Sequence, residues 1–153
     1  YLPSGTSGEI RQTVKYDFLD QYYLHLKQQS LTRKNPIAIL GDWNIAHRKI
    51  DLKNWRGNLK NSGFLPDERA WMDKIFAENL LLDAFRIIKP NTEEYTWWSY
   101  RARAWDSNAG WRIDYQMISP ELQSTVKKAT IYREQRFSDH APLIIDYDWQ
   151  IQE

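Results

Sequence analysis

The chain has no cysteine, no long apolar run and almost no net charge. Without cysteine it can form no disulfide, no thiolate nucleophile and no zinc–cysteine site, and this composition fits a reducing compartment, so we expect a cytoplasmic protein. No apolar run approaches the roughly 20 residues of a membrane span, so we expect no membrane partner. A net charge of +1 excludes a polycation, and 42% hydrophobic with 27% charged residues describes one soluble globular domain over residues 1–153.

Charges are balanced overall but segregated along the chain. Residues 47–61 hold five basic side chains against one acidic side chain, and residues 65–83 hold five acidic against two basic. Such segregation can place a basic edge against phosphates, although a charge run is more often a solvated face. Eight Trp and nine Tyr are also many for this length. They predict a core rich in aromatic rings, with the alternative that some rings stack on bases or sugars.

Apolar periodicity predicts alternating helices and strands, which is typical of an α/β fold. Apolar side chains recur at three- and four-residue steps over residues 11–29, which predicts a helix. A second helix is predicted to begin at Pro66, with acidic side chains in its first turn, and to end near Asn79. Residues 43–64 between them lack periodicity and predict a long surface loop. The predicted strands are residues 37–40, 95–100, 112–118, 125–132 and 143–147.

Three short motifs each place polar side chains at the end of a strand-like run. They are Gly41-Asp42-Trp43-Asn44, Trp111-Arg112-Ile113-Asp114-Tyr115 and Ser138-Asp139-His140-Ala141-Pro142. Carboxylates hold hard cations and accept a proton from water, while asparagine and histidine donate hydrogen bonds to phosphate oxygens, so this supply suits phosphoryl chemistry. Taken alone, a Gly-Asp-x-Asn turn is most often structural, and a lone histidine is most often a surface or core residue.

The third motif does not make a serine triad. Ser138, Asp139 and His140 are consecutive, and three consecutive side chains cannot easily converge on one substrate atom. The chain also has no Gly-x-Ser-x-Gly elbow, no His-Glu-x-x-His pair and no Walker loop. Serine hydrolase, zincin and P-loop chemistry are therefore not indicated.

The three motifs in this order, with Tyr1-Leu2-Pro3 before them, resemble the exonuclease III family of DNA-repair nucleases and abasic-site (AP) endonucleases, within the endonuclease/exonuclease/phosphatase superfamily. The resemblance covers the chain nearly end to end, but family members are longer. It therefore implies the C-terminal half of such a domain, with the N-terminal half absent. The implied fold is half of a four-layer α/β sandwich, with one mixed sheet and covering helices. We expect its uncovered apolar face to meet the missing half or to self-associate.

The resemblance also implies a role for each polar side chain. Asp42 matches the aspartate that activates or orients the attacking water, and Asn44 matches the asparagine that contacts the phosphate. Asp114 is expected to orient His140 and to favour its protonated form, so that His140 can donate to the phosphate in the transition state. Tyr1 matches a tyrosine that hydrogen-bonds the scissile phosphate. The implied cofactor is Mg²⁺ or Mn²⁺, and its expected ligands are Asp139, Asp42 and Asn44.

Three further sets of residues are expected to contact DNA. One resembles an Asn-rich loop that touches the DNA backbone, and another resembles an apolar pocket that holds a flipped-out abasic sugar. In a third segment, exposed arginine and tryptophan side chains could insert into or stack on DNA. Without the resemblance, a polar surface loop and ordinary core packing are the favoured alternatives. The three sets are Asn54, Arg56, Asn58 and Asn61 in the loop, Trp97, Trp111 and Ile113 in the pocket, and Arg101, Arg103 and Trp105 in the third segment.

The resemblance implies a hydrolase of base excision repair: an exodeoxyribonuclease III-like phosphodiesterase with 3′-5′ exonuclease activity, AP endonuclease activity or both. Its expected substrate is double-stranded DNA with abasic sites or 3′ ends. Because the family's metal-binding glutamate lies in the absent half, we expect little activity from the isolated chain. Two alternatives stay open: another superfamily phosphoesterase acting on a lipid, an inositol phosphate or RNA, and a non-catalytic DNA-binding fragment.

Overall fold

The protein combines helices with short strands in the computed structural model, which describes residues 1–6 and 8–150. The strands are β1 (Ala38–Asp42), β2 (Leu82–Asp83), β3 (Asp114–Ile118), β4 (Val126–Ile131) and β5 (Leu143–Tyr147). The α-helices are α1 (Glu9–Thr32), α2 (Pro66–Ala77) and α3 (Ala84–Ile88), and the 3-10 helices are η1 (Lys49–Asp51), η2 (Arg56–Asn58) and η3 (Pro120–Thr125).

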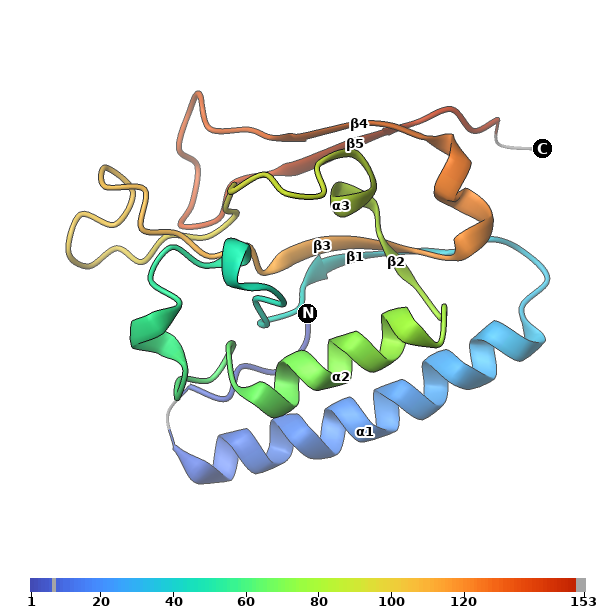
Figure 1. The fold of residues 1–153 in the computed structure, drawn as a ribbon, viewed down its shortest axis with the longest axis horizontal. Helices are drawn as coiled ribbons and strands as arrows, with labels where there is room; N and C mark the ends of the chain where they lie inside the picture. The colour runs from blue at the N-terminus through green and yellow to red at the C-terminus, as the bar shows by residue number, and fades with distance from the viewer. Residues whose placement is uncertain (7, 151–153) are drawn as a thin grey trace.

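A three-stranded antiparallel sheet, with strand order β1-β3-β2, lies in the middle of the molecule (Figure 1). Helices α1 and α2 cover one face of this sheet, and α3 with the two-stranded sheet β4-β5 lies over the other. The chain therefore forms a layered α/β structure. Among the described residues, no helix has the length and apolar character that crossing a bilayer requires.

The main apolar core lies between the two long helices and the central sheet. Leu19 of α1, Met72 and Ile75 of α2, Trp43 and Met117 pack together there, and each is at most 1% exposed. Burying a side chain of this size contributes roughly 1.5–3 kcal/mol to folding. These contacts hold both helices against the sheet and fix the position of the loop that follows β1.

Antiparallel pairing of β1 with β3 brings two of the polar motifs to one place. Asp42, the last residue of β1, lies opposite Asp114, the first residue of β3. Isolated bridges connect Trp97 with both Trp111 and His140, which draws the third motif to the same end of the sheet. Polar residues that are far apart in sequence are therefore gathered at one end of the central sheet.

The predicted α/β class is confirmed, and the predicted helices over residues 11–29 and 66–79 correspond to α1 and α2. The prediction of one mixed sheet is wrong. The described residues form two separate sheets, and every strand pair in them is antiparallel. The physical reason is that β3 lies between β1 and β2 and opposes both, while β5 returns directly along β4. The four-layer sandwich, and the place of this chain in one half of it, stay predictions.

The predicted strand over residues 95–100 is also wrong. The backbone N–H groups of Thr96 and Trp97 both donate to the carbonyl oxygen of Trp111, each at 2.8 Å, so this segment crosses Trp111 instead of running alongside it. Trp97 therefore takes part only in isolated bridges. Conversely, β2 and α3 were not predicted, because two and five residues are too few for a periodic signal.

Residues 43–64 are the predicted surface loop only in part, because most of residues 53–61 are exposed but other residues of the segment are buried. The segment contains η1 and η2, and Ile45, Ala46 and Phe64 are fully buried. An irregular backbone can bury apolar side chains at any spacing. The buried residues of such a segment therefore show neither the helical nor the strand period in the sequence. This segment forms one wall of the site described next.

Candidate active site at the ends of β1 and β3

Asp42 and Asn44 are held at the end of β1 by a tight turn. The backbone N–H of Asn44 donates to Oδ1 of Asp42 at 2.7 Å, and Asn44 adopts a left-handed conformation with φ 51°, which asparagine tolerates better than most residues. Burial raises the pKa of Asp42, the Asn44 N–H opposes that shift, and the charge of Asp114 adds to it. A carboxylate with a raised pKa is a better proton acceptor near neutral pH than an ordinary exposed aspartate.

A buried ion pair supports the Asn44 turn from behind. Nζ of Lys15 lies 2.7 Å from Oε1 of Glu68, and the same Nζ donates to the carbonyl oxygen of Asn44 at 2.8 Å. The second carboxylate oxygen of Glu68 accepts from the backbone N–H groups of Gly63, at 2.7 Å, and Leu65, at 3.0 Å. One buried carboxylate therefore positions both the Asn44 turn and the Gly63 turn.

His140 is oriented by a carboxylate. Its Nδ1 lies 2.9 Å from Oδ2 of Asp114. This hydrogen bond raises the pKa of His140, burial opposes the shift, and the charges of Asp114, Asp42 and Asp139 add to it. A protonated imidazole donates from both ring nitrogens, so Nε2 stays available to donate to a bound group.

Asp139 fixes an aromatic wall of the site. Its Oδ2 accepts from the indole Nε1–H of Trp97 at 3.0 Å, and its Oδ1 accepts from the Ser138 hydroxyl at 3.0 Å. Burial alone would raise the pKa of Asp139, but these hydrogen bonds outweigh burial and the pKa is lowered. Asp139 is therefore an ionised acceptor that holds the Trp97 ring in place.

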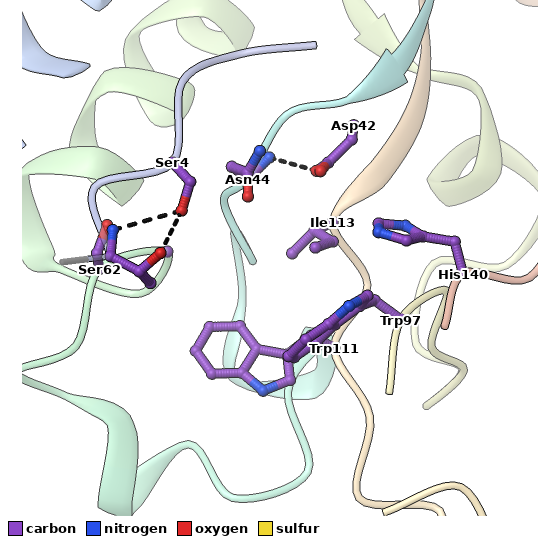
Figure 2. A pocket seen from close by; sticks show the side chains of 10 residues that line it. Ser4, Asp42, Asn44, Ser62, Trp97, Trp111, Ile113 and His140 are labelled. Carbon is purple, nitrogen blue, oxygen red and sulfur yellow. Dashed lines mark hydrogen bonds between the residues drawn. The ribbon is translucent and has the colours of Figure 1, made fainter. Parts of the chain in front are cut away.

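A cavity of about 200 Å³ opens between these groups, as Figure 2 shows. Its polar side carries Asp42, Asn44 and His140, and its apolar side carries two indole rings that meet edge to face with centroids 6.3 Å apart. The cavity can therefore hold a group that is charged on one side and apolar on the other. The residues that line it are Ser4, Thr6, Asp42, Asn44, Ser62, Gly63, Trp97, Trp111, Ile113 and His140.

The structure brings five of the predicted polar residues together and leaves one at the margin. Asp114 and Asp139 contact lining side chains without lining the cavity themselves. Tyr1 is 95% exposed and does not line this cavity, although it lines a neighbouring hollow that also includes Asp42. The catalytic roles implied for these residues stay predictions.

The predicted Asn-rich DNA contact is a folded segment. Nδ2 of Asn58 donates to the carbonyl oxygen of Asn54 at 2.8 Å, and Nδ2 of Asn61 donates to Oδ1 of Asn58 at 2.8 Å. The guanidinium of Arg56 stacks on the Trp55 ring, 4.3 Å from its centroid. Asparagine side chains thus shape this segment, and Arg56 presents a positive charge on its surface.

DNA contact by the third segment stays a prediction, but the structure tests whether its side chains are exposed. Arg101 and Arg103 are exposed, as predicted. The expectation of an exposed tryptophan is wrong, because Trp105 is half-buried. Its ring packs on the Trp98 ring in a small apolar cluster, with ring centroids 4.6 Å apart. Trp105 therefore supports the surface from below and is not free to insert into DNA.

The described residues alone do not fit a bound metal ion. Among residues 1–6 and 8–150, no group of three or more His, Cys, Asp or Glu side chains is placed to hold one. Hard cations take several oxygen ligands, and Asp139 already accepts hydrogen bonds at both of its oxygens. The metal-binding roles of Asp139, Asp42 and Asn44 therefore stay predictions.

Sequence reasoning did not identify several residues of the site. Only the pair Ser62-Gly63 has a recognisable sequence signal, because Ser-Gly marks turns and Gly63 has φ 92°. A Cβ on Gly63 would meet the Trp111 ring at 3.2 Å and the Asn44 carbonyl oxygen at 3.3 Å, so glycine is required there. The others are single polar residues whose partners lie far along the chain, and they are Ser4, Thr6, Lys15 and Glu68.

An Asp–Asn turn and a carboxylate-held histidine around one cavity supply a proton acceptor and a hydrogen-bond donor for developing negative charge, which suits hydrolysis of a phosphoester. The chain belongs to the Endonuclease/Exonuclease/phosphatase family, which matches residues 13–140. The predicted superfamily is therefore confirmed.

Individual relatives agree with this family. The chain is 44% identical over 144 residues to an exodeoxyribonuclease of Bacillus subtilis (strain 168), covering 94% of this chain and 56% of that protein. It is 34% identical over 146 residues to the DNA repair nuclease APEX1 of Danio rerio, covering 95% of this chain and 46% of that protein. An AP endonuclease from Archaeoglobus fulgidus superposes with a TM-score of 0.86 at 26% identity, covering 97% of this chain and 60% of that one. The chain thus spans about half the length of the curated relatives it matches.

Proposed function

We propose that this chain belongs to a DNA-repair phosphodiesterase, similar to exodeoxyribonuclease III, with 3′-5′ exonuclease activity, AP endonuclease activity or both. The observation that carries the proposal is the cavity in which Asp42, Asn44 and the Asp114-held His140 face two indole rings. The names of the relatives support it, since they include exodeoxyribonucleases and AP endonucleases from bacteria and eukaryotes. About half of each relative lies outside the matched region, so the activity of the whole protein is part of the proposal.

The cavity offers a proton acceptor and a proton donor for hydrolysis of a phosphodiester. Asp42, whose pKa is raised, takes the proton of a water molecule as that water attacks phosphorus. The bond from phosphorus to the leaving oxygen breaks on the opposite side, and the leaving oxygen takes up a proton from solvent. His140, whose pKa is raised by Asp114, donates from Nε2 to a phosphate oxygen, where negative charge grows in the transition state. Asn44 contributes a neutral amide beside them.

The proposed substrate is double-stranded DNA. Trp97, Trp111 and Ile113 give the cavity an apolar wall, which suits a deoxyribose without a base. On the surface, Arg56 of the Asn54–Asn61 segment and Arg101 supply cations for backbone phosphates, which position DNA without reading its sequence.

The proposed cofactor is Mg²⁺ or Mn²⁺, which would supply Lewis-acid stabilisation of the phosphate. We expect further ligands from outside these residues, because within residues 1–6 and 8–150 no group of three or more His, Cys, Asp or Glu side chains is placed to hold a metal ion. For the same reason we expect weak cleavage by the 153-residue chain alone.

A chimera tests this proposal directly. The segment of the Bacillus subtilis exodeoxyribonuclease that aligns with this chain would be replaced by this chain, and cleavage of a labelled abasic duplex would be measured with Mg²⁺ and with EDTA. We expect the chimera to cleave, and we expect Asp42→Asn in it to lower the rate by roughly two to four orders of magnitude, the usual contribution of a general base. Asp146→Asn makes the same chemical change at an exposed position of β5 and should leave the rate unchanged.

The outcomes separate the competing functions. A folded chimera that binds the abasic duplex but does not cleave it would contradict the proposed enzyme and favour a non-catalytic DNA-binding role. Cleavage that loses less than tenfold on Asp42→Asn would remove Asp42 from the role of general base. Hydrolysis of an inositol phosphate or RNA in preference to DNA would favour another phosphoesterase of the superfamily.

A further inference from the structure

Two loops that lie beside each other on the surface carry exposed arginines, and two of these, Arg133 and Arg136, have no role in the function proposed above. One is residues 99–108, and the other is residues 132–138 in the connection from β4 to β5; Nη1 of Arg133 in the second donates to Oδ1 of Asn108 in the first at 3.0 Å. We call this region the arginine surface. Its four arginines are all exposed, and they are Arg101, Arg103, Arg133 and Arg136.

Aromatic rings hold two of these guanidinium groups in place. The Arg133 guanidinium lies 4.6 Å from the centroid of the Trp98 ring and 4.9 Å from that of Trp105. The Arg136 guanidinium lies 4.7 Å from the Tyr100 ring and 5.0 Å from Trp105. Stacking on rings restricts the rotamers of a long side chain before any ligand arrives, so less entropy is lost on binding.

Most of these cations lack an acidic partner. Arg103 pairs with Asp106 at 3.0 Å, but within residues 1–6 and 8–150 no carboxylate oxygen lies within 4.0 Å of a side-chain nitrogen of Arg101, Arg133 or Arg136. Nε of Arg136 donates to the carbonyl oxygen of Ser138 at 3.1 Å, and its two terminal nitrogens make no hydrogen bond within residues 1–6 and 8–150. Positioned guanidinium groups without acidic partners are suited to an anion from outside the chain.

Packing alone explains the buried rings of this region but not the exposed ones. Trp98 is fully buried and Trp105 is half-buried, so an arginine that covers them also shields a core. Tyr100 is 71% exposed and Phe137 is 67% exposed, so much of each ring is open to solvent, although the Arg136 guanidinium lies against Tyr100 and Tyr132 stacks on Phe137 with ring centroids 6.1 Å apart. Open aromatic rings beside backbone-binding cations are the combination that binds unpaired bases.

We propose that the arginine surface binds a single-stranded segment of nucleic acid, with guanidinium groups on its phosphates and Tyr100 and Phe137 stacked on its bases. A duplex hides the faces of its bases, so exposed rings favour a strand that is unpaired. The surface also leads to the candidate site, because Phe137 and Ser138 share a hollow of about 370 Å³ with His140 and Asp114. The inference rests on the proposed function and adds to it the path of a strand that leaves the cavity.

Salt-dependent binding of a labelled oligothymidine of about 12 nucleotides tests the proposal. We expect Arg133→Gln/Arg136→Gln to weaken binding and to make the slope of log affinity against log salt shallower by up to about 1.4, because each phosphate contact on a single strand contributes about −0.7. Tyr100→Ala/Phe137→Ala should weaken binding roughly tenfold or more and leave the slope unchanged, because stacking releases no counterions.

A matched control loses the same charge elsewhere. Lys34, just after α1, and Lys128, on β4, are exposed, and Lys34→Gln/Lys128→Gln should change neither affinity nor slope. Thermal melts check that each variant is folded. Arg133→Lys/Arg136→Lys keeps both charges and should keep the slope, even if lost packing on the tryptophan rings lowers stability.

Three results would overturn the proposal. One is an unchanged slope in the folded arginine variant, which would mean that Arg133 and Arg136 are only solvated. Another is a loss of affinity for a blunt duplex without a loss for oligothymidine, which would identify duplex backbone as the partner. The last is equal competition by polyglutamate, which would identify a non-selective polyanion surface. Failure of the proposed function is distinguishable, because it would appear as a folded chimera that cannot cleave an abasic duplex, whatever this surface binds.

Discussion

Three carboxylates surround one imidazole at the candidate site, and the local structure gives each carboxylate different partners. Burial raises the pKa of Asp42, hydrogen bonds lower the pKa of Asp139, and Asp114 is engaged with Nδ1 of His140. In the function proposed above, Asp42 is the proton acceptor, Asp139 holds the Trp97 indole and Asp114 supports the cationic donor His140.

The His140–Asp114 pair predicts a pH dependence of stability. A group whose pKa is raised by folding binds its proton more tightly in the folded protein, so charged His140 stabilises the fold below its ordinary pKa of 6.5. This stabilisation is lost as the pH rises through the raised pKa. Urea unfolding on both sides of pH 6.5 should therefore show a free energy of unfolding that falls with rising pH.

Variants of both partners identify the source of that dependence. His140→Gln and Asp114→Asn should each remove the decrease in the free energy of unfolding above pH 6.5, because either change eliminates the charged pair. Asp146→Asn removes an exposed carboxylate of β5 and should leave the fall in place. If the free energy of unfolding still decreases with rising pH in His140→Gln, a different titrating group must be the cause.

The polar residues at the ends of strands could be predicted from the sequence, whereas the residues that hold them in place, such as Lys15 and Glu68, could not. Asp42, Asn44, Asp114, Asp139 and His140 stand in short motifs, so their identity was visible, and the antiparallel register then placed them together. A motif does not separate site residues from core residues, however. Arg112 stands beside Asp114, yet it is fully buried between Asp51 and Asp83, with a nitrogen 2.7 Å from an oxygen of each.

At the scale of elements, long periodic segments were predictable and short irregular ones were not. Helices α1 and α2 span 24 and 12 residues, enough for the apolar period to repeat. Residues 95–100 have the composition of a strand, but the amide groups of Thr96 and Trp97 share the Trp111 carbonyl, and that of Trp98 donates to the Asp139 carbonyl instead of continuing a ladder with one strand. Which strands pair, and in which direction, depends on contacts between distant segments that composition does not record.

The Lys15–Glu68 pair joins elements that the sequence keeps apart. It links α1 to α2, and through the Asn44 carbonyl and the Gly63 N–H it links both helices to the two turns that line the cavity. Glu68 also accepts from the Ser62 hydroxyl at 3.2 Å. The pair is fully buried, and it sets the distance between the Asn44 turn and the Gly63 turn, which line the site.

Breaking this pair should destabilise the fold strongly. Lys15→Met leaves the Glu68 carboxylate buried without its cation, which typically costs roughly 3–5 kcal/mol of folding free energy. In Lys15→Met/Glu68→Gln the charge is gone but an amide oxygen can still accept from the Gly63 and Leu65 N–H groups, so the double variant should be the more stable of the two. Urea unfolding measures both, and Lys27→Met, in an exposed pair with Glu78, is the control that should change little. A double variant less stable than Lys15→Met would contradict this account.

At the scale of the whole molecule, one side of the structure is closed by helices and another is open. β1 is an edge strand of its sheet, and near its end the N–H of Leu2 donates to the carbonyl oxygen of Asp42 at 2.8 Å. Apolar side chains lie exposed around this edge and the β4-β5 sheet: Leu40 at 61%, Phe137 at 67% and Ile144 at 45%. Leu40 and Phe137 line the same hollow beside His140, so the open side adjoins the candidate site.

An edge strand with exposed apolar neighbours is a template for another chain, so we expect the 153-residue chain to self-associate through β1. Sedimentation velocity over a wide concentration range should show a mass that grows with concentration. Leu40→Lys places a charge on the open side of β1 and should shift the chain toward the monomer. Leu31→Lys makes the same change at a leucine that is 80% exposed near the end of α1, and it should leave the association unaltered. A monomer at every concentration would mean that the open side of β1 does not bind a second copy, and an equal response to the two substitutions would mean that net charge, rather than β1, controls association.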